Sequence, residues 1–132
     1  TNLTKNHRRC VTLPHLGAST AEAEDNCAIM VVDQVRDFLE NGNIRNAVNF
    51  PEVVVARRTA HRMICANANV PNMLGQISET LGEAKLNIHD MVNRSRGDHA
   101  YTVVDLDSPV PEAVLNQVAH IEGVLMARAL PA

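Results

Sequence analysis

Several features that would mark membrane or nucleic-acid proteins are missing from this 132-residue sequence. The longest apolar run, residues 27–32, is far too short to span a bilayer, and the N-terminus lacks the charged-then-apolar order of a signal peptide. The formal net charge is −3, and basic residues form no run longer than a pair, such as Arg8–Arg9. This leaves no electrostatic footprint for nucleic acid. We therefore expect a cytoplasmic protein whose partners include neither a membrane nor a nucleic acid.

Cysteine and histidine are present without the spacing of a disulfide framework or a metal site. The three cysteines, Cys10, Cys27 and Cys65, form neither pairs nor a C-x-x-C motif, so we interpret them as reduced thiols that pack as small apolar groups. The six histidines show no H-x-x-x-H or H-x-H spacing. A hairpin could bring His89 and His99 face to face, but we interpret them as an ordinary surface pair. No metal site is predicted.

The first 60 residues predict a short strand at 11–13 and one long helix over about 20–40. Ser19 and Glu22 have the spacing of a capping box at its start, and an Asn–Gly pair follows its end. Residues 27–32 are apolar nearly all round the helix, which indicates burial on several sides. Nothing else in the first 60 residues could cover them. We expect another domain or a second chain to do so, and this region to be less stably ordered than the rest.

The remainder of the chain predicts a small α+β domain. Residues 43–60 are interpreted as an extended connector that separates two units. After it, apolar periodicity and turn residues predict the order β-α-β-β-α-β, with segments at about 64–66, 74–85, 88–95, 99–106, 111–118 and 124–130. This is the ferredoxin-like arrangement, in which right-handed crossovers place both helices on one face of a four-stranded antiparallel sheet.

Three asparagines lie where this domain would change direction. Asn67 and Asn69 form a corner after the first strand, and Asn87 opens the next strand, so we expect the chain to bring the three together. Amides both donate and accept, and a helix start adds free N–H groups, a combination that suits a small zwitterion such as an amino acid. Ordinary turn chemistry is the simpler explanation on spacing alone, because Asn bonds its own backbone and tolerates left-handed dihedrals.

Two resemblances sharpen this interpretation. The element order over residues 62–130, with its Asn–x–Pro corner, resembles the ACT domain, a regulatory module that usually binds amino acids between two copies. "LPHLGASTAEAE" at 13–24 and "NAVNFPEV" at 46–53 resemble the end of the catalytic part of D-3-phosphoglycerate dehydrogenases, where an ACT domain follows. The combined order implies a C-terminal fragment, with a 2-hydroxyacid dehydrogenase remnant and linker at 1–55 and an ACT domain at 56–132.

The dehydrogenase resemblance implies roles for the first motif. His15 matches the histidine that acts as general acid/base, and the glutamate that pairs with it in the family is absent from this chain. Gly17, Ala18 and Ser19 match the turn that approaches the nicotinamide end of NAD. The sequence has no G-x-G-x-x-G turn for a pyrophosphate. The resemblance therefore implies an NAD-dependent parent enzyme, and we expect this chain alone neither to bind NAD nor to turn over substrate.

The ACT resemblance implies an effector site. Asn67, Asn69 and Asn87 match positions that contact L-serine in feedback-inhibited family members, although histidine is common at the first and glycine usually stands where this chain has Asn72. Two copies paired side by side would face the corner of one toward Asn87 of the other. A dimer is then the minimum assembly, with serine or another small amino acid as effector.

Two other functions compete with an amino-acid sensor of a serine-biosynthetic enzyme. One is a purely structural dimerisation domain that has lost its effector site, for which Asn72 is the indication. The other is a stand-alone metabolite-binding protein that shares the ACT fold. The first 55 residues weigh against the second rival, because a sensor has no use for the histidine at position 15.

Overall fold

The computed structural model describes residues 8–9, 11, 17 and 19–130. Its elements are, in chain order, α1 (Ala21–Asn41), β1 (His61–Ala68), α2 (Met73–Glu83), β2 (Ile88–Arg96), β3 (His99–Leu106), α3 (Glu112–Ala119) and β4 (Val124–Ala129). The predicted β-α-β-β-α-β order is confirmed, and β3 has the predicted bounds. The predicted strand at 11–13 lies largely outside the described residues.

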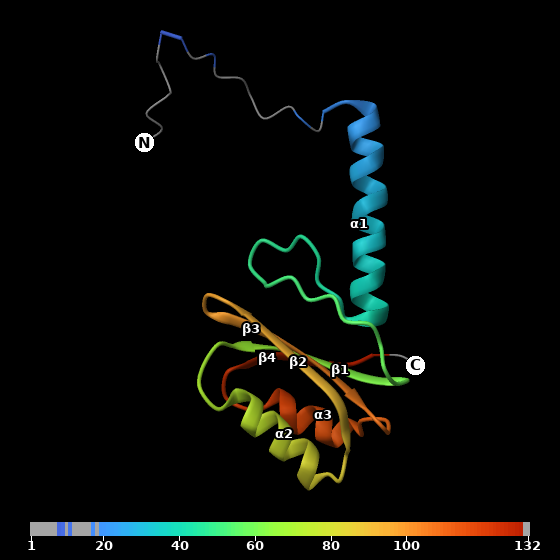
Figure 1. The fold of residues 1–132 in the computed structure, drawn as a ribbon, viewed down its shortest axis with the longest axis vertical. Coiled ribbons are helices and arrows are strands. Elements are labelled where there is room, and N and C mark those ends of the chain that lie inside the picture. The colour runs from blue at the N-terminus through green and yellow to red at the C-terminus, as the bar shows by residue number, and fades with distance from the viewer. Residues whose placement is uncertain (1–7, 10, 12–16, 18, 131–132) are drawn as a thin grey trace. The chain divides into compact units, whose positions relative to one another are not determined.

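The four strands form one sheet in the order β2-β3-β1-β4 (Figure 1). Every neighbouring pair is antiparallel, with β1 and β3 at the centre and β2 and β4 at the edges. Both β1 and β2 run antiparallel to β3, so they are parallel to each other. This is the ferredoxin-like topology that the sequence predicts.

The two faces of the sheet carry separate apolar clusters. Helices α2 and α3 cover one face (Figure 1), where Met63 and Cys65 of β1 meet Ile77 and Leu81 of α2. On the other face, buried strand residues pack against Val53 and other side chains of the segment after α1. These strand residues are Ile64, Ala66, Tyr101 and Val103. Strand side chains alternate between faces, so the central strands β1 and β3 contribute to both clusters.

The segment after α1 differs from its prediction. Residues 43–60 contain an isolated antiparallel bridge between Ile44 and Val53, and Val53 is only 1% exposed. The segment therefore packs on the sheet as a third layer, and its interpretation as a connector that merely separates two units is wrong. A run of three valines looks like a short extended stretch in sequence, but its burial depends on which surface it meets.

Helix α1 begins and ends close to its predicted limits, but its cap is different. Thr20 Oγ1, rather than the Ser19 hydroxyl, accepts a hydrogen bond from Ala23 N at 3.2 Å. None of the described residues of α1 is buried, and Ile29 is 62% exposed. The apolar middle of the helix thus has no cover from the other described residues before position 34.

Contacts divide the chain into two compact units, residues 1–33 and 34–132. The unit that contains the sheet therefore includes the last residues of α1 and the whole segment 42–58. The division proposed from sequence, at residues 55 and 56, concerns the ancestry of the two parts, which compactness does not test.

Candidate functional site

Two of the four residues matched to dehydrogenase chemistry are described by the structure. His15 and Ala18 lie outside the described residues. Gly17 and Ser19 are both exposed, and no described atom lies within 4 Å of a Cβ placed on Gly17. The roles assigned to these four residues stay predictions.

Asn67 is almost completely buried, near the end of β1. It is 1% exposed, and its Nδ2 donates to Ala68 O at 2.7 Å. Its Oδ1 accepts a hydrogen bond from Thr102 Oγ1 at 3.4 Å, and that hydroxyl in turn accepts from Asn93 Nδ2 at 2.8 Å. These contacts form a polar ladder from β1 across β3 to the edge strand β2. The amide of Asn67 thus already has partners within the sheet.

Asn69 and Asn72 shape the corner between β1 and α2. Asn69 Nδ2 donates to Gly97 O at 2.9 Å, and its backbone N–H donates to Asp98 O at 2.9 Å, which ties the corner to the β2–β3 hairpin. Asn72 has φ 67° and is the N-cap residue of α2, without a side-chain capping bond among the described atoms. It takes up the left-handed conformation that glycine favours, which asparagine tolerates better than most residues. The N–H groups of the first turn of α2 therefore receive no cap from Asn72.

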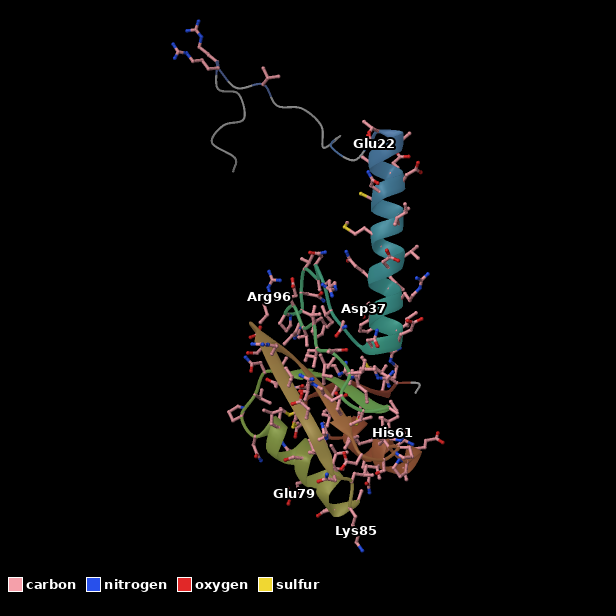
Figure 2. All side chains as sticks on the ribbon, turned by 45° about the vertical axis from the view of Figure 1, so that its right-hand side comes forward. Glu22, Asp37, His61, Glu79, Lys85 and Arg96 are labelled. Atoms are coloured by element: carbon pink, nitrogen blue, oxygen red, sulfur yellow. The ribbon has the colours of Figure 1, made fainter. Side chains whose placement is uncertain are left out.

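Asn87 lies at the opposite end of the sheet. Its Nδ2 donates to Asp107 Oδ2 just after β3, whereas Asn69 bonds residues just before β3. Strand β3 has eight residues and so spans roughly 26 Å. Figure 2 shows the two ends of β2: Lys85 lies just before the strand, near Asn87 in sequence, and Arg96 is its last residue, next to Gly97. The expectation that the three amides converge within one chain is wrong.

The antiparallel sheet explains this separation. Helix α2 returns the chain to the end of the sheet at which β1 begins, because β2 runs parallel to β1. Asn87 therefore opens β2 near the start of β1, while Asn67 and Asn69 follow its end. A site that uses all three groups requires the corner of one copy and the β2 start of another.

Sequence patterns did not single out the most strongly bonded polar pair of the described structure. Arg62 of β1 and Asp105 of β3 are paired in register, and their side chains are 0% and 1% exposed. Arg62 Nε lies 2.6 Å from Asp105 Oδ1. The sequence did contain a signal. Arg62 shares one face of β1 with Ile64 and Ala66, and Asp105 shares one face of β3 with Val103. Two opposite charges thus occur among apolar residues, on strands that pair.

Electrostatics at this pair follow from its contacts. Burial of Asp105 opposes ionisation and raises its pKa, but hydrogen bonds from the Arg62 side chain and the Arg58 backbone, together with the charges of Arg62 and Arg57, outweigh it. The pKa of Asp105 is therefore held below its ordinary value, and its carboxylate is ionised near neutral pH.

Other chemistry is sparse in the described part of the chain. It contains no group of three or more His, Cys, Asp or Glu side chains arranged to hold a metal ion. Among the same residues, no helix combines the length and apolarity needed to cross a membrane. Cys65 lies under α2, where burial raises the pKa of its thiol to about 12, so it is a packing residue rather than a nucleophile.

Comparison with known proteins gives close relatives for most of the chain. D-3-phosphoglycerate dehydrogenase of Haemophilus influenzae is 31% identical over 121 residues, which are 91% of this chain and 30% of that protein. The protein of the same name from Escherichia coli K12 is 31% identical over 119 residues, 89% of this chain and 29% of its own length. This chain thus spans about 30% of the length of the curated relatives that it matches. No family model matches.

Similar solved structures include the ACT domain of a GTP pyrophosphokinase from Chlorobium tepidum. It has a TM-score of 0.47 and 12% identity, and the match covers 53% of this chain and 95% of that one. The regulatory subunit of aspartate kinase from Thermus thermophilus gives a TM-score of 0.40 and 13% identity, and covers 60% of this chain and 56% of its own.

Proposed function

Because this chain is homologous to D-3-phosphoglycerate dehydrogenases over most of its length, we propose that it is the regulatory and assembly part of such an enzyme. The parent is an NAD-dependent oxidoreductase of the cytoplasm, which converts 3-phosphoglycerate to 3-phosphohydroxypyruvate in serine biosynthesis. The homology over about nine-tenths of the chain is the observation that carries this proposal. The ferredoxin-like order of strands supports it independently.

The residues present do not fit a dinucleotide by themselves. His15, Gly17, Ala18 and Ser19 match the family's catalytic and nicotinamide-proximal positions, but the sequence contains no glycine-rich turn for the pyrophosphate. We derive no catalytic step from this chain, and we expect it to be silent with 3-phosphoglycerate and NAD.

The regulatory role rests on an effector site shared by two copies. Asn69 and the uncapped first turn of α2 supply donors for a carboxylate at the corner, and Asn87 of a second copy supplies an acceptor for an ammonium group. Because these groups lie at opposite ends of one sheet, their joint use requires a dimer that pairs about a two-fold axis. L-serine, or a similarly small amino acid, suits such a site because it carries both a carboxylate and an ammonium group.

A structural dimerisation domain is the second candidate, and specific contacts favour it. All three amide side chains already donate within their own chain, Asn67 to Ala68, Asn69 to Gly97 and Asn87 to Asp107. One N–H group of each amide is therefore already used, which leaves fewer donors for a ligand. Asn67 also lacks the positive charge that a histidine could bring to a carboxylate.

Calorimetric titration of the purified chain with L-serine separates the two candidates. A sensor gives saturable heat that Asn87→Ala abolishes and that D-serine does not reproduce. Asn49→Ala, which changes an exposed asparagine without a left-handed backbone in the segment after α1, is a matched control and should leave the heat unchanged. If neither serine nor any other small amino acid binds, the structural candidate is correct.

A further inference from the structure

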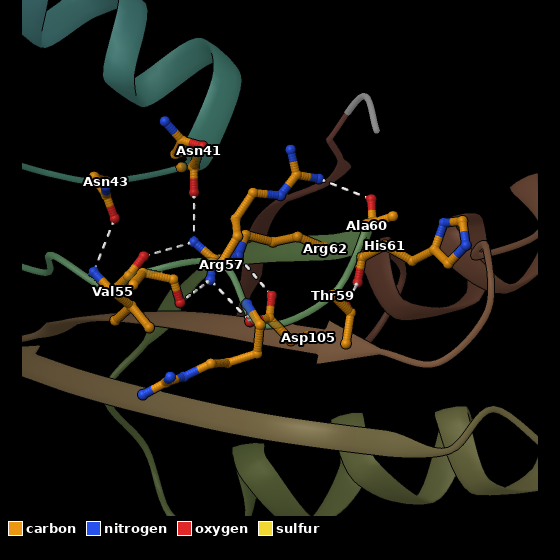
Figure 3. A network of polar contacts seen from close by, with 12 residues as sticks. Asn41, Asn43, Val55, Arg57, Thr59, Ala60, His61, Arg62 and Asp105 are labelled. Carbon is orange, nitrogen blue, oxygen red and sulfur yellow. Dashed lines mark hydrogen bonds and ion pairs between the residues drawn. The ribbon is translucent and has the colours of Figure 1, made fainter.

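The guanidinium of Arg62 joins three parts of the domain. It has five N–H groups, and each has an acceptor (Figure 3). Nε and Nη2 donate to the two oxygens of Asp105, at 2.6 and 2.9 Å. The remaining N–H groups donate to backbone carbonyls of Asn41 (2.9 Å), Val55 (2.9 Å) and Ala56 (3.0 Å). A buried arginine with every donor satisfied links β1 and β3 to the end of α1 and to the segment that follows it.

Asp105 completes the same connection from the other side. Its Oδ2 also accepts the backbone N–H of Arg58 at 2.8 Å. We call residues 42–58 the strap and the Arg62–Asp105 pair the clamp. Four backbone groups, those of Asn41, Val55, Ala56 and Arg58, bond to the clamp. Loss of either charged side chain leaves buried donors or acceptors unpaired.

The strap also makes contacts that do not involve the clamp, including the burial of Val53 on the sheet. Tyr101 donates its hydroxyl to Gly42 O at 2.8 Å, and Arg96 on the exposed rim donates to Ala47 O at 3.1 Å. The strap also bonds itself through the bridge between Ile44 and Val53. Its apolar cluster lies on the face opposite α2 and α3, and no strap residue belongs to the cluster under those helices. The strap and the helix-covered core are thus fastened by different residues.

We propose that the clamp holds the strap as a releasable cover, which detaches from the second face of the sheet when the pair is broken while the helix-covered face stays folded. The face beneath the strap is apolar, with Ile64, Ala66 and Val103 at its centre. Release therefore exposes a surface that binds hydrophobic dyes and associates with other apolar surfaces. This state goes beyond amino-acid binding and does not depend on it.

Native-state hydrogen exchange of the full chain, resolved by residue, tests the cover. Arg62→Gln and Asp105→Asn each break the clamp. Arg94→Gln is the control, because it replaces arginine by glutamine at an exposed position of β2. In the two clamp variants we expect about ten- to hundredfold faster exchange at the strap amides of Ile44 and Val53, because their single bridge is too short to persist once the strap leaves the sheet. Amides of α2 and α3 should change by less than about twofold, as should all amides of Arg94→Gln. Dye binding should rise only in the clamp variants.

The outcomes decide the proposal in either direction. Equal loss of protection in the strap and in α2 means that the clamp supports the whole domain at once, and the proposal is overturned. Unchanged protection in the strap overturns it as well. If both clamp variants fail to fold, Arg62→Lys decides, because it keeps the positive charge beside Asp105 but lacks the forked guanidinium that bonds Val55 O and Ala56 O. Faster exchange confined to the strap in that variant supports the cover, and uniform or absent change contradicts it.

Discussion

Gly42 is the position at which a single methyl group should be most informative. It has φ 72°, a conformation that costs an L-residue about 1–2 kcal/mol. A Cβ at this position would lie 2.5 Å from Ile64 Cγ2 and 3.1 Å from Leu130 Cδ1. Both neighbours belong to the cluster beneath the strap, so the added methyl overpacks it at a further cost of about 1–3 kcal/mol. We expect Gly42→Ala to lower the free energy of unfolding by about 2–5 kcal/mol.

Two other glycines separate these contributions. Gly97 has φ 59° with nothing within 4 Å of an added Cβ among the described atoms, so Gly97→Ala should cost only the conformational part, about 1–2 kcal/mol. Gly82 is an exposed residue of α2 with the same open space, so Gly82→Ala should stabilise the domain by up to about 1 kcal/mol. Urea denaturation at a common slope measures all three variants. Equal destabilisation by Gly42→Ala and Gly97→Ala would refute the close packing of the strap.

Three further predictions concern ionisation and packing. The pKa of Asp105 is lower in the folded state than in the unfolded state. Its contribution to stability is therefore complete above the unfolded pKa of about 3.9 and is lost as the pH falls through the folded pKa. Urea midpoints should fall on acidification, and they should fall less steeply in Asp105→Asn. Thiol labelling mapped by mass spectrometry should modify exposed Cys27 in the native protein and buried Cys65 only after unfolding; native labelling of Cys65 would contradict its placement. Ile77→Ala, at a fully buried site of α2, should cost about 2–5 kcal/mol, whereas Leu74→Ala, at a residue that is 40% exposed, should cost far less; similar values would show that α2 does not pack as described.

Sequence patterns predicted the strands and helices well, because local signals agree there. The Gly97–Asp98 reversal and the β-branched residues around it fix the β2–β3 hairpin, and Gly123 marks the start of β4. These signals are short-range, so neighbouring residues are sufficient to recognise them. The order of elements then leaves few alternatives to the ferredoxin-like sheet.

Long-range placement was predicted less well. The strap looked like a connector because three valines carry no information about the surface they meet. Asn87 looked close to Asn69 because both border α2, but the parallel course of β1 and β2 separates them by the length of the sheet. Arg62 and Asp105 are 43 residues apart, so predicting their contact requires the register between β1 and β3. Each of these depends on pairing, which no local pattern contains.

The central claim is that an amino-acid effector binds between two copies, with the corner of one and the β2 start of the other. Mixing two inactive variants tests it directly. Asn69→Ala and Asn87→Ala should each fail to bind L-serine in calorimetric titration. After denaturation and refolding together in equal amounts, about half the dimers combine both variants, and each of these has one site with both asparagines intact. The account predicts that serine binding returns at about a quarter of the wild-type capacity. A mixture as silent as its two components would contradict a shared site.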